Sequence, residues 1–318
     1  MFWETLLFTA SVTLPVCAML LAGIALKRFQ FIDDHFVTTA SRLVFNFCMP
    51  ALLFTSIINL DMASVLDFRM VIYAVIASIV TFLTARILAA QACTSSADYG
   101  AFIQGAARAN LAIVGMALAG NIYGSHGIAL MSLALAFLVP LYNVLSVFVL
   151  AYYASDKNDV PFSWKKLIID LTKNPLIASI VVGFCFVSLG LQLPAVAEKV
   201  SLYFAQITLP LALISIGGSL SMDVLRKTSK SAVWATLHKV CLMPVMTVLV
   251  AWLLGLRGID LGIIFLIFAC PTAAASFVMT KAMGGNDKLA ANIVVLTTLG
   301  SLPATAIGIF TLRYCNLI

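Results

Sequence analysis

Long apolar segments of about 20 residues, separated by short polar connections, follow one another along the whole chain. A segment of this length crosses the hydrocarbon core of a bilayer as a helix. Hydrophobic residues make up 62% of the 318 residues and charged residues 10%, whereas soluble domains keep about a quarter of their residues charged. The bilayer must therefore act as solvent for most of the surface, and the length fits about ten spans with no soluble domain.

The chain is expected to be an all-α membrane protein with ten transmembrane helices. The first apolar segment is interpreted as a span, because it has neither the basic start nor the small-residue cleavage site of a signal peptide. After the fifth span, residues 155–173 place apolar side chains at helical spacing around Trp164, which indicates a cytoplasmic linker with an amphipathic helix in the membrane interface. The expected spans are 6–26, 37–60, 70–90, 99–123, 127–153, 175–191, 200–220, 232–254, 261–283 and 290–312.

Basic residues in the connections predict the orientation. The connections on one face hold eleven Lys and Arg residues and those on the other face hold four. Because basic residues collect on the cytoplasmic side, both termini are expected to be non-cytoplasmic. The net charge of +6 has the same origin and, without a basic stripe among aromatic residues, does not indicate nucleic-acid binding. Arg42, Arg86 and Lys239 lie near predicted cytoplasmic helix ends and are interpreted as anchors that reach the interface.

The two halves of the chain correspond at a shift of 160 residues, where helix-bending residues coincide. The pairs are Pro15 with Pro175, Gly23 with Gly183, and Pro50 with Pro210; a shift of 161 pairs Asn110 with Pro271. Two halves of five helices must insert with opposite orientation, which is the inverted repeat of many secondary transporters. One repeat is expected in 1–154 and the other in 174–318. The expected helix-breaking or hinge positions are Pro50, Pro210, Pro271 and Gly115.

Spans 99–123 and 261–283 are predicted to be interrupted near the middle, at Asn110 and Pro271. Both positions lie among small residues, which let two interrupted helices cross closely. Pro271 removes a backbone donor, and freed peptide groups are tolerated in a membrane only within protein or beside a wet cavity. Each second half-helix directs N–H groups and a positive dipole end at the crossing, where a carboxylate is a natural guest. The alternative is two helices that are merely kinked.

Four more residues complete the candidate substrate site. Arg108 lies deep in its span, where a charge indicates function. It either holds a carboxylate through two hydrogen bonds, or it is a structural residue that reaches the interface or pairs with carbonyl groups at the crossing. Thr272 follows Pro271 and carries one of the backbone amides at the crossing. Asn143 and Asn46 are candidate pocket walls, with hydrogen bonds between helices as the alternative.

Several function classes lack support in the sequence. All thirteen Asp and Glu residues fall in connections or near span ends, so no ion site built on a carboxylate at mid-membrane is visible, and coupling to a proton, to sodium or to the membrane potential stays open. The seven cysteines form no C-x-x-C pair and are interpreted as small core residues. No metal or cofactor is predicted, and no hydrolase motif indicates an enzyme.

Several motifs resemble the auxin efflux carrier family in its bacterial branch. The most specific is SRLVFNFCMPALLF at 41–54, and GIALKRFQFID at 23–33 is a weaker match. Other weaker matches are NLA from Asn110, NP from Asn174 and TLPLALI from Thr208. The resemblance covers essentially the whole chain.

This resemblance implies a scaffold of helices 1, 2, 6 and 7 and an elevator-like transport domain of helices 3–5 and 8–10. It places the substrate where helices 4 and 9 cross, at positions matched by Asn110 and Pro271. Plant relatives carry auxin, and bacterial relatives are linked to malate, malonate and similar carboxylates. The expected function is secondary transport, by efflux or uptake, of a small organic anion such as a mono- or dicarboxylate across the bacterial inner membrane, with a homodimer left open. The alternatives are a sodium-coupled transporter of the bile-acid type and a membrane sensor that does not move its ligand.

Overall fold

The computed structural model describes residues 2–59, 68–153, 175–220 and 228–318, and the parts that it describes are helical, with no strand beyond one isolated bridge. Seven helical stretches are long and apolar enough to cross a membrane. They are Phe2–Arg28, Asp34–Ile58, Arg69–Ala92, Leu111–Tyr153, Ala195–Ser219, Lys230–Leu253 and Asp287–Tyr314. Two shorter apolar helices, Pro175–Ser188 and Gly258–Ala269, accompany them. The prediction of an all-helical membrane protein is therefore confirmed.

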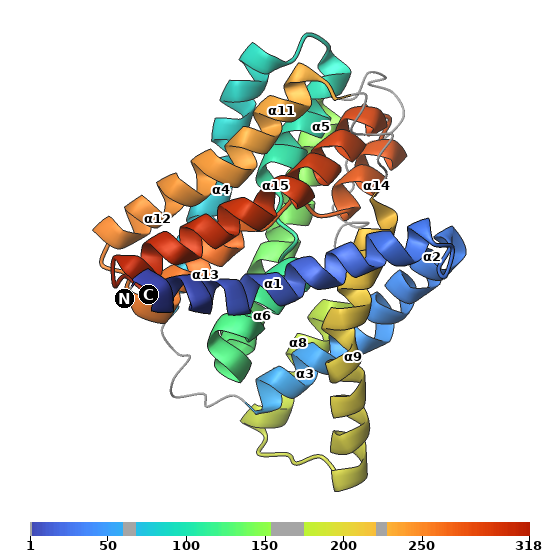
Figure 1. Cartoon of the computed structure of the whole chain (residues 1–318), viewed down its shortest axis with the longest axis vertical. Helices are drawn as coiled ribbons and strands as arrows, with labels where there is room; N and C mark the ends of the chain where they lie inside the picture. The colour runs from blue at the N-terminus through green and yellow to red at the C-terminus, as the bar shows by residue number, and fades with distance from the viewer. Residues whose placement is uncertain (1, 60–67, 154–174, 221–227) are drawn as a thin grey trace.

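One group of helices packs around α9 and α3 (Figure 1). Its members are α1 (Phe2–Arg28), α2 (Asp34–Leu43), the π-helix η1 (Val44–Cys48), α3 (Met49–Ile58), α8 (Pro175–Ser188) and α9 (Ala195–Ser219). α2, η1 and α3 follow one another without a gap and form one rod. Asp33 caps this rod by accepting a hydrogen bond from the Phe36 backbone N–H at 2.7 Å.

The second group lies above α1 in the same view, and one of its members, α6, runs past α1 and contacts the first group (Figure 1). It contains α4 (Arg69–Ala92), α5 (Ser96–Ala107), the π-helix η3 (Leu111–Gly115), α6 (Met116–Tyr153), α11 (Lys230–Leu237), the π-helix η4 (His238–Leu242), α12 (Met243–Leu253), α13 (Gly258–Ala269), α14 (Ala275–Ala282) and α15 (Asp287–Tyr314). α6 packs against both groups, and α1 also packs against α15, so the two termini lie side by side. Gly124 has non-helical backbone angles inside α6, so this long helix is kinked between the predicted spans 99–123 and 127–153.

Close backbone contact joins α1 to α9. A Cβ atom added at Gly23 would lie 2.2 Å from the carbonyl oxygen of Ile214, and one added at Gly217 would lie 2.1 Å from that of Leu20. Neither position has room for a side chain, because the nearest atoms belong to the backbone of the other helix. Small residues commonly allow this approach between membrane helices, where packing replaces the hydrophobic effect as the source of association.

The core lies around α13 and α5, in the second group. Every residue of α13 from Leu261 to Ala269 is buried, as expected for a helix that is apolar on all sides. By contrast, α1 and α9 expose large apolar side chains such as Leu7, Leu21 and Tyr203, which a lipid environment can cover. The predicted amphipathic helix in 155–173 lies outside the described residues, and the division into repeats at 1–154 and 174–318 stays a prediction.

Candidate functional site

The backbone leaves the helical conformation between α5 and η3. α5 ends at Ala107, and Arg108 is extended, with φ −70° and ψ 126°. Asn110 precedes η3 with φ −86° and ψ 70°, and no side chain caps the first amides of that helix. The predicted interruption near Asn110 is therefore present. It leaves the amides at the start of η3 without partners in the preceding helix.

A second interruption separates α13 from α14. α13 ends at Ala269, and Cys270 is extended, with φ −57° and ψ 141°. α14 begins at Ala275, again with no side-chain cap. Pro271, between the two helices, has no N–H to donate. The predicted interruption at this proline is also present.

The two interruptions cross and bind each other. Ala109 and Thr272 form an isolated antiparallel bridge, and the Asn110 backbone N–H donates to the Pro271 carbonyl oxygen at 2.8 Å. The Thr272 hydroxyl donates to the Gly105 carbonyl oxygen at 2.5 Å, and its backbone N–H donates to the Thr297 hydroxyl at 3.1 Å. The peptide groups freed by the breaks thus find partners within the protein, as a membrane interior requires.

A cavity of about 840 Å³ lies against this crossing. The predicted residues Arg108, Asn110, Asn143 and Asn46 all line it, whereas Pro271 and Thr272 do not. Its other polar wall residues are Thr38, Ser41, Arg42, Ser215 and Ser219, and most of the remaining wall is apolar. The crossing therefore offers a few polar groups within a largely apolar pocket, which is the usual composition of a small-molecule site.

Arg108 is a buried cation without a carboxylate partner among the described residues, and its side chain is only 8% exposed. Its guanidinium donates to the Asn143 side-chain oxygen at 2.9 Å, to the Met279 sulfur at 2.9 Å and to the Ser146 hydroxyl at 3.4 Å. All three acceptors are neutral. The arrangement orients the guanidinium but leaves its positive charge uncompensated by any described acidic residue.

The amides at the site differ in the use of their side chains. Asn143 accepts from Arg108, so the hydrogen bond between helices that was its alternative interpretation is present. Asn46 lies in η1 and donates to the Arg42 carbonyl oxygen at 2.8 Å. The side chain of Asn110 makes no hydrogen bond to the parts of the chain that the structure describes. Asn110 therefore lines the cavity with an amide that no described side chain or backbone group engages.

Several wall residues were not predicted. Ala273, Ala274 and Ala275 follow Pro271 and line the cavity, and their small side chains leave the backbone at the start of α14 close to it. Met279 contacts Arg108 one turn further along α14. The run of three alanines after Pro271 was visible in the sequence, but the Met279 contact depends on how the two interruptions cross.

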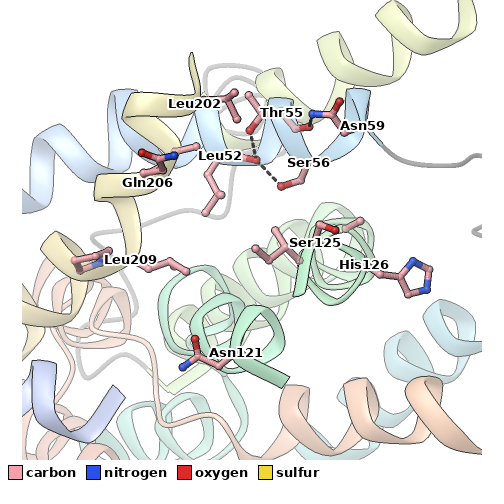
Figure 2. A pocket seen from close by; sticks show the side chains of 14 residues that line it. Leu52, Thr55, Ser56, Asn59, Asn121, Ser125, His126, Leu202, Gln206 and Leu209 are labelled. Carbon is pink, nitrogen blue, oxygen red and sulfur yellow. Dashed lines mark hydrogen bonds between the residues drawn. The ribbon is translucent and has the colours of Figure 1, made fainter. Parts of the chain in front are cut away.

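A second cavity of about 670 Å³ lies between α3, α9 and α6 (Figure 2). Neutral polar groups and one histidine line it, among leucine and alanine side chains. Thr55 and Ser56 both donate to the Leu52 carbonyl oxygen, at 3.1 and 2.6 Å (Figure 2). The polar residues of this wall are Thr55, Ser56, Asn59, Asn121, Ser125, His126 and Gln206.

Three of the positions predicted as hinges lie within helices. Pro50 is the second residue of α3, and α3 begins directly after η1. Pro210 lies inside α9, which continues past it as one helix. Gly115 ends η3, and a Cβ atom added there would contact the Cys270 sulfur at 3.3 Å. Their role as hinges stays a prediction.

The interpretation of Lys239 as an interfacial anchor is wrong. Lys239 lies in η4, is 1% exposed, and donates from its Nζ to the Phe268 carbonyl oxygen at 3.2 Å. The neighbouring His238 is also buried, with its Nδ1 at 3.3 Å from the Ala106 carbonyl oxygen. The span containing Lys239 packs against α13 and α5, so the side chain reaches a helix end inside the protein instead of the interface.

Comparison with known proteins decides the family. A family model described as membrane transport protein matches residues 8–309. The chain belongs to this family of membrane transporters, the auxin efflux carriers. The resemblance inferred from the motifs at 23–33 and 41–54 is thereby confirmed.

Two archaeal relatives of this auxin efflux carrier family member span nearly the same length. An uncharacterized transporter of Methanothermobacter thermautotrophicus is 22% identical over 292 residues, which cover 91% of this chain and 93% of the relative. An uncharacterized transporter of Methanocaldococcus jannaschii is 22% identical over 302 residues, covering 93% and 96%. The transporter class is thus shared along essentially the whole chain.

Proposed function

We propose that this auxin efflux carrier family member transports a small organic anion, a mono- or dicarboxylate, whose carboxylate binds beside Arg108 and Asn110. The observation that carries the proposal is the buried guanidinium of Arg108, which meets only neutral acceptors among the described residues. A lone charge inside a membrane protein is costly. An anionic guest would offset that cost and would also meet the side-chain amide of Asn110, which has no hydrogen-bond partner among the described residues.

The backbone at the crossing adds to this preference for an anion. η3 and α14 both begin at the interruptions without side-chain caps. Their first N–H groups and positive dipole ends favour a negative charge near Asn110 and Ala274, both of which line the cavity. The apolar remainder of the wall suits the carbon skeleton of an organic acid better than a small inorganic anion.

The chain crosses the membrane ten times, as two inverted repeats of five helices. In this count, α2, η1 and α3 form one span. The helices on the two sides of each interruption also form one span together, and the kink at Gly124 divides α6 between two spans. The correspondence of Asn110 with Pro271 supports the repeat, because these residues lie at the two interruptions that cross.

The transport cycle is an elevator movement of the helices around the crossing against a scaffold of α1, α2, η1, α3, α8 and α9. Support comes from the two cavities, which lie along successive stretches of α9: one is lined by residues of the last two turns, from Ala212 to Ser219, and the other by residues of the middle of the helix, from Leu202 to Pro210. Movement along this seam would carry Asn110 from one cavity towards the other. The first cavity includes Arg42 and so faces the predicted cytoplasmic side.

Binding and flux measurements test the proposal. Purified protein is screened by thermal shift against malonate, malate, acetate and neutral analogues, and any ligand found is then followed into proteoliposomes. Loss of a hydrogen bond to a charged group costs about 1.5–3 kcal/mol, so Arg108→Gln is expected to weaken binding about 10- to 100-fold. Asn110→Ala is expected to weaken binding in the same direction.

Arg86→Gln is the matched control, because Arg86 is exposed and donates to the Tyr153 hydroxyl away from the cavity. It is expected to bind and transport like the unaltered protein. Normal transport by both Arg108→Gln and Asn110→Ala, in folded protein, would refute the site. Binding without flux in proteoliposomes would instead favour a membrane sensor.

A further inference from the structure

Two neighbouring residues of η4 reach the ends of both interrupted helices. Lys239 Nζ donates to the carbonyl oxygen of Phe268, the penultimate residue of α13. His238 Nδ1 lies 3.3 Å from the carbonyl oxygen of Ala106, the penultimate residue of α5. The two contacts are made to different helices, α5 and α13, but in both a basic side chain lies close to a carbonyl oxygen in the last turn of the helix. They place one basic side chain at the carboxyl end of each broken helix.

The carboxyl end of a helix attracts positive charge. The last carbonyl groups of a helix lack partners within it, and the helix dipole adds negative potential there. In transporters with discontinuous helices, such carbonyl groups and helix ends coordinate sodium ions. In this protein, the carbonyl oxygen at the end of α13 already has a cation, since the ammonium group of Lys239 lies 3.2 Å away.

No described carboxylate competes with the Phe268 carbonyl group for the charge of Lys239. Lys239 is 1% exposed, and no carboxylate of the described residues forms an ion pair with it. Lys239 does not line the cavity beside Arg108. The charge of Lys239 is therefore directed at the carbonyl group, and Arg108 remains the cation of the cavity wall.

We propose that Lys239 is a resident cation of the crossing, which occupies the place of a coupling sodium ion at the end of α13 and makes anion transport independent of sodium. The inference rests on the proposed function for its consequence in transport, but the cation site can be examined without any anion. Substitution of Lys239 by a small residue should open a site for a free monovalent cation beside the Phe268 carbonyl group.

The test compares thermal stability in NaCl and in choline chloride at equal concentration, with full-length protein purified in detergent. The unaltered protein should have the same Tm in both salts. Lys239→Ala should have a lower Tm in choline chloride and regain at least half of the loss in NaCl, in a saturable manner. Lys239→Met keeps the volume without the charge, so its Tm should be lower in both salts.

Lys230→Ala serves as the control, because Lys230 is an exposed residue at the start of α11. It should behave like the unaltered protein in both salts. A sodium-dependent rise in the Tm of the unaltered protein would overturn the proposal, as would equal responses of Lys239→Ala to both salts. If Lys239→Ala does not fold, a Lys239→Met variant with unchanged Tm in choline chloride would overturn it.

The two proposals fail in distinguishable ways. Failure of every carboxylate to bind, together with sodium rescue of Lys239→Ala, would contradict the proposed substrate class and support the resident cation. Carboxylate uptake that requires sodium in the unaltered protein would have the opposite meaning: the substrate class would stand, and the resident cation would be overturned.

Discussion

Arg108 and Lys239 bring positive charge into the packed interior, and neither forms an ion pair with a described acidic residue. Neutral dipoles hold both: side-chain acceptors and a sulfur for Arg108, and a backbone carbonyl group for Lys239. Breaking a buried ion pair is costly because one charge is left behind. A cation held by dipoles avoids that cost when an anionic substrate leaves, which suits a site that must load and empty.

The hydroxyl of Tyr123 is buried and has no hydrogen-bond partner among the described residues. An unsatisfied buried group costs about 1–3 kcal/mol, so Tyr123→Phe is expected to leave Tm unchanged or to raise it. Tyr73→Phe is the matched control, because the Tyr73 hydroxyl donates to the Thr247 carbonyl oxygen at 2.5 Å. Thermal unfolding in detergent should show a lower Tm for the control alone, and a clear loss of stability in Tyr123→Phe would contradict this.

Two of the π-helices share a sequence context. η1 and η4 are each followed at once by a Met-Pro pair, Met49-Pro50 and Met243-Pro244. Proline lacks the N–H of a regular helical turn and clashes with the carbonyl group four residues earlier, so the turn before it can widen. Such widened turns are frequent at functional sites. Here they carry Asn46 on the cavity wall and Lys239 at the crossing.

Contact between α1 and α9 depends on Gly217. Gly217→Ala places a methyl group 2.1 Å from the Leu20 carbonyl oxygen, so the helices must separate and stability should fall by at least about 1 kcal/mol. Gly300→Ala in α15 is the control, because the nearest atom to an added Cβ there is 3.7 Å away. Thermal unfolding should show a lower Tm for Gly217→Ala only. Equal values for the two variants would contradict the close contact.

Two packed groups of helices meet along a seam, and the two cavities follow one another along it. Along α9, the boundary between the cavities falls at Pro210 to Ala212, and along α3 it falls between Met49 and Leu52. Pro50 and Pro210, which correspond in the repeat, therefore lie at about the same level of the seam. In the proposed cycle, this level separates the two sides of the membrane.

The positive-inside bias predicts that both termini are non-cytoplasmic. Fusions to the C-terminus in a bacterial host provide the measurement: alkaline phosphatase should be active and green fluorescent protein should be dark. Fusions truncated within the connection at 28–34 should give the reverse, because Lys27 and Arg28 mark the predicted cytoplasmic end of α1. A fluorescent C-terminal fusion would invert the assignment of the cavities to the two sides.

The sequence by itself determined that the chain lies in a lipid bilayer, that it is helical, and where its helices break. Apolar length admits only helices or closed barrels in a bilayer, and Pro271 and the small residues around Asn110 act on their own backbone. The residues Arg108, Asn110, Asn143 and Asn46 could be chosen for the cavity because charge and amide groups are rare in such apolar spans. The sequence also indicated the family, because each of the motifs at 23–33 and 41–54 is an uninterrupted run of residues that can be recognised without the tertiary structure.

Only the tertiary structure decided which groups face each other. Thr272 lies next to Pro271, yet its hydroxyl binds Gly105 and not the cavity. Position near a predicted cytoplasmic helix end favours an interfacial anchor at Lys239, whereas the direction of its side chain depends on η4 and on the packing of α13. Local spacing fixes where a chain bends, but the partner of a long side chain is fixed by helices that lie far away in the sequence.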